Sequence, residues 1–437
     1  MKVSRYLFLQ GQISHFFSDL GLGLHRRGYP VHRINFNRGD RRFWRLPGSL
    51  DFTGTAAAWP AFLLEQCRAW AITDLILFGD CRPLHVAAIQ LARERGIAVQ
   101  VFEEGYLRPD YVTLEAGGVN GHSGLPRDPQ SYLAAAASLP AWSAGQAIAA
   151  NFSRRAWDDV TYNAAAVLGA WRFPHYRSHR AWHPFVEYAV GVQRFPLKAW
   201  SRQQTLQRAC ALWEGSVPYF LFPLQLDADS QIRFHAPAGG MLVAIDTVLR
   251  SFAAHAPAEA LLVITEHPLD YGPVDLPQAV AQGAAALGLS ARVVCLRGGS
   301  PAALVQRARG LVTVNSTIGL SALAVSVPVI TLGKAIYNLP GLTAQQGMDA
   351  FWQQPTAPDA VLFDAFRRVV AARTQINGGF HSDEGIALAV AGAIEKLEQR
   401  AMVTHTVAAH AAADQPRSDH EVWPLPPPAI AASTTAA

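Results

Sequence analysis

Apolar and polar positions follow a repeating strand–helix pattern over the first 126 residues. Short apolar runs typical of buried strands occur at 5–11, 31–40, 74–80 and 98–106, the second of them leading into a polar loop. Residues 14–31 and 82–96 carry apolar side chains at the spacing of one helix face. Repeated strand–helix–strand units of this kind predict a parallel sheet covered by helices.

The rest of the chain divides into three further regions. From 127 to 215 the strand signals fade, and Ala-rich and Trp-rich helical segments dominate. The strand–helix pattern resumes over 216–402, with strands expected at 219–225, 260–268 and 292–298, helices at 240–256 and 300–310, and a strand–loop–helix–strand unit at 311–333. Residues 403–437 hold few large apolar side chains, so we expect this tail to be disordered.

Composition narrows the class of protein. A chain of 437 residues favours two domains, and a formal charge of +4 says little by itself. The four cysteines, Cys67, Cys81, Cys210 and Cys295, form no metal-like spacing and are expected as buried free thiols in a reducing cytoplasm. The start of the chain does not match a signal peptide, and no apolar run is long enough to predict a transmembrane helix.

Two polar clusters follow strands where ligands of α/β proteins bind, beyond the carboxyl ends of the sheet. Glu103 and Glu104 follow the apolar run at 98–102, and the flexible Gly105 comes next, which suits an acid or base at a cleft edge. A solvated turn would show the same residues. His267 ends the strand at 260–265 beside Glu266 and precedes Pro268, which suits a ligand contact, although a structural role is the alternative.

The stretch FPLQLDADSQIRFHAP carries a polar side chain at every second position from Gln225 to His235. If the segment is extended, these side chains share one face, which an exposed strand would also explain. Because the stretch follows an apolar strand, we interpret it as a loop at a sheet's carboxyl edge. Its polar positions are Gln225, Asp227, Asp229, Gln231, Arg233 and His235.

Asn315, Ser316 and Thr317 lie between a buried strand and an apolar helix. One hydroxyl could simply cap the helix, or the helix start could bind a phosphate. Together the four clusters predict an α/β, GT-B-like fold, in which two doubly wound Rossmann-like domains face a cleft. The domains are expected at 1–126 on the acceptor side and 216–402 on the nucleotide-sugar side, with a basic and aromatic helical insert at 127–215.

Several motifs in order resemble the capsular polysaccharide biosynthesis and export proteins of the KpsS/LipB type. They are FLQGQISHFF with INFNRGDRRFW, EEGYLRPDY, QLDADSQIRFH, TEHPLDYG, and VNSTIGLSAL with PVITLGKAIYNLPGLT, between residues 5 and 345. The resemblance implies a retaining transferase that moves Kdo from CMP-Kdo to a lyso-phosphatidylglycerol acceptor. This reaction starts the poly-Kdo linker of a capsule, and related modules are thought to form a covalent sugar–Asp adduct.

The resemblance also assigns expected roles. Asp229 is the expected nucleophile, with Asp227 as the second choice, and Glu103 or Glu104 would deprotonate the acceptor. Gln225 and Gln231 would bind the sugar, and Arg233 would offset its carboxylate. His267, Asn315, Ser316 and Thr317 would hold the cytidylyl phosphate. No cofactor or metal is expected beyond the donor, although the DAD sequence at 227–229 keeps a metal as an alternative.

Basic and aromatic residues interleave in the predicted insert, with Arg172, Arg177 and Arg180 beside Trp171 and Trp182, and Arg194, Lys198 and Arg202 around Trp200. This pattern suits the anionic cytoplasmic face of an inner membrane. A core-packing insert with a basic rim, or a nucleic-acid surface, would be alternatives. A second basic cluster, at Arg38, Arg41, Arg42 and Arg45, could face a phosphate or carboxylate, with Asp40 as a local partner.

Two other functions stay open. The chain could be a non-catalytic capsule export or assembly factor, or a GT-B transferase that uses another nucleotide sugar. The expected partners are a nucleotide-sugar donor, an anionic lipid acceptor and the capsule machinery, without nucleic acid. The expected location is the cytoplasm, peripheral on the inner membrane.

Overall fold

The computed structural model describes residues 3–149, 151–180, 182–186, 188–192, 205, 207, 215, 217–226, 230–236, 239–267, 270, 274–297 and 301–413. Residues up to Ile394 belong to one compact unit, and the chain from Glu395 onward belongs to another. None of the described helices is both long and apolar enough to cross a lipid bilayer. Cys67 and Cys81 are buried free thiols, as predicted, and the free Cys295 is half-buried; Cys210 lies outside the described residues.

The first sheet is built around the N-terminal strand. Its strand order is β12-β6-β5-β4-β1-β2-β3, and β1 to β5 are parallel. The strands are β1 (Tyr6–Phe8), β2 (Val31–Asn35), β3 (Leu50–Asp51), β4 (Asp74–Phe78), β5 (Ala98–Glu104), β6 (Tyr111–Ala116) and β12 (Gln375–Asn377).

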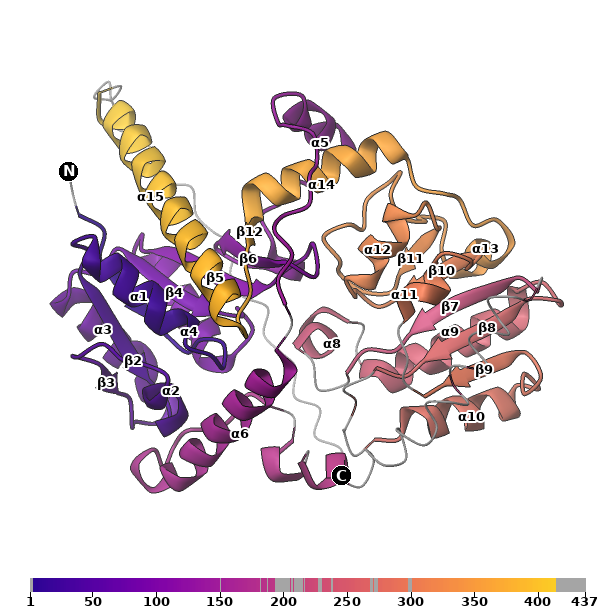
Figure 1. The fold of residues 1–437 in the computed structure, drawn as a ribbon, viewed down its shortest axis with the longest axis horizontal. Helices are drawn as coiled ribbons and strands as arrows, with labels where there is room; N and C mark the ends of the chain where they lie inside the picture. The colour runs from indigo at the N-terminus through magenta and orange to yellow at the C-terminus, as the bar shows by residue number, and fades with distance from the viewer. Residues whose placement is uncertain are drawn as a thin grey trace, which may run out of the picture. The chain divides into compact units, whose positions relative to one another are not determined.

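One strand of this sheet, β6, runs antiparallel to the others, where the sequence predicted a parallel sheet, because it pairs antiparallel with both β5 and β12. Only six residues separate β5 from β6, too few for the crossover that a parallel pair requires, so the two strands form a hairpin. β12 pairs with β6 although it lies more than 250 residues later in the sequence, within the range predicted for the second domain (Figure 1). The predicted domain boundaries stay a prediction.

The second sheet is wholly parallel, with the order β11-β10-β7-β8-β9. It repeats the plan of the first sheet, since the first strand of each lies centrally and the next two strands extend to one side. The chain then returns to the other side, which makes both sheets doubly wound. The predicted α/β class is therefore confirmed. The strands are β7 (Tyr219–Pro223), β8 (Leu261–Thr265), β9 (Val293–Leu296), β10 (Gly310–Thr313) and β11 (Val329–Thr331).

Helices connect and cover these strands. In the first part of the chain they are α1 (Phe16–Arg26), α2 (Arg38–Arg42), η1 (Ala56–Ala58), α3 (Trp59–Ala69), α4 (Pro83–Glu94), η2 (Asn120–His122), α5 (Pro129–Ala136), α6 (Phe152–Leu168) and η3 (Ala170–Arg172). In the second part they are α8 (Ser230–His235), α9 (Gly240–His255), α10 (Leu276–Ala286), α11 (Pro301–Val305), α12 (Ile318–Ala324), α13 (Met348–Gln353), α14 (Ala360–Thr374) and α15 (Asp383–Ala413).

Buried apolar side chains fill both faces of the second sheet. Along β7, Tyr219 and Leu221 join a core with α12 and α14, and Phe220 and Phe222 join a core with α9 and Trp352. Successive side chains of a strand point to opposite faces, so a wholly apolar strand is required where both faces are covered. The run YFLFP is therefore a central strand, as predicted.

Two segments differ from the sequence predictions. The stretch after β7 is not a loop throughout, because Ser230–His235 forms α8. Neighbouring polar positions two residues apart do not share a helix face, so the condition for one polar face from Gln225 to His235 is not met. At the C-terminal end, α15 continues to Ala413, beyond residue 402 where we expected the folded chain to end.

Candidate functional site

A pocket of about 170 Å³ is lined by residues that follow strands of both sheets. Parallel strands place their carboxyl ends at one edge of a sheet, so loops distant in sequence meet there. Seven of the predicted site residues line this pocket, together with Tyr106, Arg108, Asn120, Lys334 and Tyr337: Glu103, Glu104, Gln225, His267, Asn315, Ser316 and Thr317.

Glu103 and Glu104 end strand β5 and are half-buried. Gln12, which follows β1, donates a hydrogen bond from its Nε2 to Glu104 Oε1 at 3.0 Å. Gly105 is buried, and a Cβ at this position would lie 2.0 Å from the carbonyl oxygen of Tyr111. The glycine is thus required by close packing of the β5–β6 hairpin, and not by the flexibility that the sequence indicated.

On the second sheet, Gln225 is buried and fixes the residue that follows β10. Its Nε2 donates to Asn315 Oδ1 at 2.9 Å, and its Oε1 accepts from the backbone N–H of Asn315 at 3.1 Å. Both polar atoms of this amide are hydrogen-bonded to Asn315. Gln225 would therefore act on a ligand indirectly, by positioning Asn315. Gln225 therefore ties the end of β7 to the end of β10.

The turn Asn315–Thr317 is held by Tyr337. The Tyr337 hydroxyl donates to the carbonyl oxygen of Ser316, and a Cβ on Gly319 would lie 2.3 Å from that hydroxyl oxygen. Ser316 Oγ accepts from the backbone N–H of Ile318 at 3.3 Å, whereas the Thr317 side chain makes no capping hydrogen bond. The hydroxyl of Ser316 thus caps helix α12, and Thr317 lines the pocket.

His267 and Lys334 add basic groups to the same wall. His267 is half-buried two residues after β8, and Lys334 is exposed three residues after β11. The sequence analysis did not single out Lys334. Its only signal was its place after a buried strand, in the motif PVITLGKAIYN, and a single lysine in such a loop is common on protein surfaces.

A second, larger pocket of about 590 Å³ shares Glu103, Glu104 and Asn120 with the first. Its other walls are basic and aromatic, and they include residues from the loop after β1 and from β4, α6 and α8. Among the lining residues are Gln12, Asp80, Arg82, Arg155, Tyr162, Tyr176, Arg177, His179, Arg180 and Arg233. Arg233 therefore lies in this pocket and not in the smaller one; its Nη1 donates to the carbonyl oxygen of His179 at 2.6 Å.

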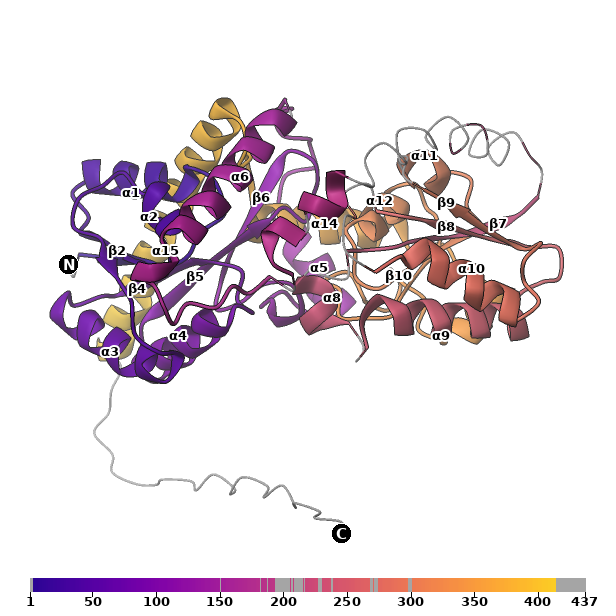
Figure 2. The same ribbon diagram turned by 90° about the horizontal axis from the view of Figure 1, so that it is seen from below.

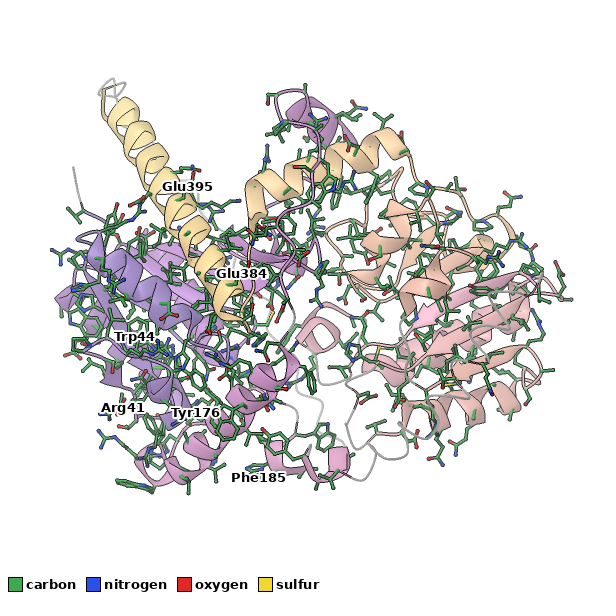
Figure 3. The ribbon with its side chains drawn as sticks, in the orientation of Figure 1. Arg41, Trp44, Tyr176, Phe185, Glu384 and Glu395 are labelled. Atoms are coloured by element: carbon green, nitrogen blue, oxygen red, sulfur yellow. The ribbon has the colours of Figure 1, made fainter. Side chains whose placement is uncertain are left out.

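A buried polar network under the larger pocket joins α6 to the first sheet. Asp40 accepts hydrogen bonds from Gln10 Nε2 at 3.2 Å and from the Tyr162 hydroxyl at 2.9 Å. Gln10 Nε2 also lies 3.0 Å from the hydroxyl oxygen of Tyr176, which is labelled in Figure 3. Asp40 is thus a structural residue, but its described side-chain partners are Gln10, Tyr162 and Arg33 and not the arginine cluster that the sequence suggested. The network fixes α6 against α2.

Two histidines near this pocket, His179 and His85, are held neutral. Burial and the nearby Arg82 guanidinium lower the pKa of His179, and the same causes lower the pKa of His85 to about 3. Desolvation disfavours the charged imidazolium, and neighbouring cations disfavour it further. These imidazoles therefore add no charge near neutral pH, and the positive charge of the pocket comes from its arginines.

One group of three side chains in the described part of the chain has the spacing of a metal site. Ligand atoms of Asp80, Cys81 and His122 lie within 4.8 Å of one another. Burial and Asp80 raise the pKa of the Cys81 thiol, which donates to Asp80 Oδ1 at 3.2 Å. Asp80 Oδ2 also accepts from the backbone N–H of Val119 at 3.0 Å. A protonated thiol is a poor metal ligand, so these contacts favour a hydrogen-bonded network.

Some predicted residues cannot be placed. Asp227 and Asp229 lie outside the described residues, as do Pro268 and Trp200, and the side chain of Gln231 is not described. The sequence analysis in turn did not single out Gln12, Asp80 and Arg82. Their signal was their position after β1 and β4, the two strands between which the strand order of the first sheet reverses.

Comparisons with known proteins place the chain. The model for "Capsule polysaccharide biosynthesis protein" matches residues 73–381. The chain is 34% identical over 386 residues to "Capsule polysaccharide export protein KpsS" of Escherichia coli, covering 86% of this chain and 97% of that protein. It is 34% identical over 384 residues to "Capsule polysaccharide modification protein LipB" of Neisseria meningitidis serogroup A, covering 86% and 91%.

Among solved structures, KpsC of Thermosulfurimonas dismutans, a beta Kdo 2,7 transferase, aligns with 89% of this chain and 97% of its own. The identity is 12% and the TM-score is 0.44. A likeness this distant says nothing about the substrate of the present chain. The family match over residues 73–381 and the two relatives at 34% identity do decide the family. The chain belongs to the capsule polysaccharide biosynthesis protein family.

Proposed function

We propose that the chain is a glycosyltransferase of capsule biosynthesis. In the proposed reaction it moves Kdo from CMP-Kdo to a lyso-phosphatidylglycerol acceptor with retention, and so starts the poly-Kdo linker. The observation that carries the proposal is the pocket of about 170 Å³, in which two carboxylates of the first sheet share a wall with imidazole, amide, hydroxyl and ammonium groups of the second. The donor and acceptor are taken from the family resemblance of the motifs.

The second sheet suits the donor. His267, Lys334, Ser316 and Thr317 line the pocket without any acidic side chain from that sheet among its described lining residues. Charge-assisted hydrogen bonds to a phosphate are shorter and stronger than neutral ones. We assign the cytidylyl phosphate to these groups. Asn315, held by Gln225, is assigned to the donor as well.

The first sheet suits the acceptor. Glu103 or Glu104 would accept the proton of the attacking hydroxyl, since a carboxylate within hydrogen-bond reach is a common general base. Both residues also line the larger pocket, whose arginines would hold the phosphate of the acceptor. Arg233 in that pocket would then act on an anionic group of the acceptor or of the sugar.

Retention requires a nucleophile or a front-face route, and a carboxylate is the usual nucleophile. We assign this role to Asp229, with Asp227 as the alternative. In the sequence they lie between Leu226, which lines the smaller pocket, and α8. No metal is included in the proposal, because the basic groups of the second sheet can stabilise the leaving phosphate. An enzyme with a lipid acceptor would work on the membrane surface, as a peripheral protein of the cytoplasmic face.

The test incubates the purified chain with CMP-Kdo, generated in situ, and a fluorescent lyso-phosphatidylglycerol, beside an Asp229→Ala variant. Asp246→Ala is a matched control, because Asp246 is exposed and pairs with Arg250 on its own helix. Mass spectrometry should show the addition of one Kdo by the wild type and the control, and none by Asp229→Ala. The anomeric configuration of the product, determined by NMR against that of the donor, tests retention.

Other outcomes would point elsewhere. Product formed by Asp229→Ala would keep the activity and remove Asp229 as the nucleophile. No product from any folded variant would exclude this donor–acceptor pair. CMP-sialic acid and UDP-sugars would then be tried, and failure of all of them would favour the export or assembly role that the name of the Escherichia coli relative suggests.

A further inference from the structure

An open groove of about 590 Å³ lies where helix α6 packs against α2. Both views show the two helices side by side (Figure 1 and Figure 2). Three arginines of α2 line one wall, and four residues of α6, three of them apolar, line the other. These residues are Arg38, Arg41, Arg42, Thr161, Ala164, Ala165 and Leu168. Arginines therefore line one groove together with a mainly apolar helix wall.

The arginines carry more positive charge than the nearby acids can offset. Arg41, labelled in Figure 3, pairs with Asp51 at 3.1 Å, but Arg172 pairs with the same carboxylate at 3.0 Å. Arg38 and Arg42 are exposed, and within the described ranges no ion pair joins either to an acid. A net positive charge thus lines the groove, available to an anionic group from outside the protein.

The outer face of α6 is apolar where a water-exposed helix would be polar. Trp157 is 66% exposed and Leu168 is 71% exposed, and Val160 lies between them on the same face. Trp171, in the next turn of chain, is 77% exposed. The spacing of 157, 160, 164 and 168 is that of one helix stripe. The buried polar residues of the helix, Asp158 and Asn163, lie outside this stripe.

Tryptophan beside arginine is typical of the interface between water and lipid, where the ring sits at headgroup level and the guanidinium meets phosphate. A nucleic acid would supply the phosphate but has no acyl chain for the wall formed by Ala164, Ala165 and Leu168. An anionic phospholipid supplies both. We propose that the α2–α6 groove and the exposed stripe of Trp157, Leu168 and Trp171 dock the protein on an anionic phospholipid membrane.

The position of α6 connects this docking surface to the candidate site. Ala166 and Val167 of the same helix line the larger pocket, and Ala164, Ala165 and Leu168 line the groove. One helix therefore separates the membrane side from the pocket that holds Glu103 and Glu104. The inference rests on the proposed function, because a lipid acceptor would be delivered from this side, and it names the surface that receives it.

The test measures co-sedimentation of the full chain with vesicles of phosphatidylglycerol and phosphatidylcholine, and with phosphatidylcholine alone. One variant combines Arg38→Gln and Arg42→Gln, and a second combines Trp157→Ser, Leu168→Ser and Trp171→Ser. The control combines Arg68→Gln and Val361→Ser, which change an exposed arginine and an exposed apolar residue on other helices.

We expect the wild type and the control to bind the anionic vesicles and not the neutral ones. Each groove variant should bind at least about tenfold more weakly, and the arginine variant should lose most of the salt dependence of binding. Thermal unfolding should match the wild type, since every replaced side chain is exposed. Equal binding by wild type and both groove variants would overturn the proposal, and so would a wild type that does not bind.

Two further measurements separate the alternatives. Binding of a single-stranded oligonucleotide through the same residues, without vesicle binding, would make the surface a nucleic-acid site. A wild-type dimer that the tryptophan variant dissociates would make it a contact between copies.

Transfer by the wild type to a water-soluble, short-chain acceptor is measured separately. If the protein binds vesicles but does not transfer sugar, the docking proposal stands and the proposed function fails. If it transfers sugar but does not bind vesicles, the proposed function stands and the docking proposal fails.

Discussion

The two sheets share one strand order but differ in the chemistry at their carboxyl ends. Each begins with its central strand, adds two strands on one side and returns to the other. The first sheet presents Glu103 and Glu104 to the smaller pocket, whereas the second presents His267, Lys334 and the Asn315–Thr317 turn. The shared topology therefore determines where a ligand can bind, and the residues after each strand determine the charge of that binding site.

This difference divides the proposed reaction between the sheets. A carboxylate can serve as the base for a hydroxyl group, and hydrogen-bond donors with positive charge can stabilise a leaving phosphate. If the division is right, damage to the first sheet should lower the rate of the chemical step, and damage to the second should weaken donor binding. Variants of each sheet can test this separately.

The largest effect is expected on the first sheet. The double variant Glu103→Gln, Glu104→Gln removes both candidate bases and keeps the size of the side chains. Since a positioned general base contributes a factor of about 10²–10⁴, kcat should fall by that factor. Calorimetric binding of CMP-Kdo or CMP should change little. Glu65→Gln, on the exposed surface of α3, is the control and should be fully active.

A double variant that still transferred sugar at the wild-type rate would remove both carboxylates from the mechanism. A variant that lost donor binding to the same extent as activity would show that the two sheets do not divide the work. The single variants would then identify which of the two glutamates is responsible.

A smaller effect is expected on the second sheet. Lys334→Met removes the positive charge from the pocket wall. A hydrogen bond to a charged group contributes about 1.5–3 kcal/mol, so the KM for the donor should rise about tenfold to a hundredfold, with a smaller change in kcat. Arg68→Gln is the charge-matched control, since Arg68 is exposed on α3. A rise in the KM for the acceptor alone would place Lys334 on the other substrate.

The sequence predicted the parts of the fold that depend on local pattern. The apolar runs at 74–78 and 219–223 are buried central strands, and seven predicted polar residues line one pocket. Both results follow from general properties, because a strand covered on both faces is wholly apolar and parallel strands gather their carboxyl ends. Those rules need no knowledge of which distant segments pair.

The parts that depend on distant contacts were not predictable. Nothing in residues 375–377 indicates that they pair with β6, more than 250 residues earlier. The sequence of the stretch after β7 indicated a loop, but six of its residues form α8, because a polar period of two is weak evidence over so few residues. The reason for Gly105 likewise became clear only from its contact with Tyr111.

The smallest effect is expected from a buried imidazole of the first sheet. His85 is buried, and its Nδ1 lies 2.8 Å from the carbonyl oxygen of Gly79, at the end of β4. Burial and Arg82 lower its pKa to about 3 from the ordinary 6.5. Below pH 6.5 the unfolded chain therefore binds a proton that the folded chain does not, and folding stability is lost as the pH falls toward 3.

The loss from one such group is about 1.4 kcal/mol per pH unit. His85→Gln should reduce the pH dependence of the unfolding free energy by this slope between the folded and unfolded pKa values, measured by urea titration across that window. Val361→Ser, which changes an exposed residue of α14 that does not titrate, is the control and should leave the slope unchanged. If both variants kept the wild-type slope, the folded chain would protonate His85 as readily as the unfolded chain does, and the interior around His85 would be more accessible to water than its 1% exposure implies.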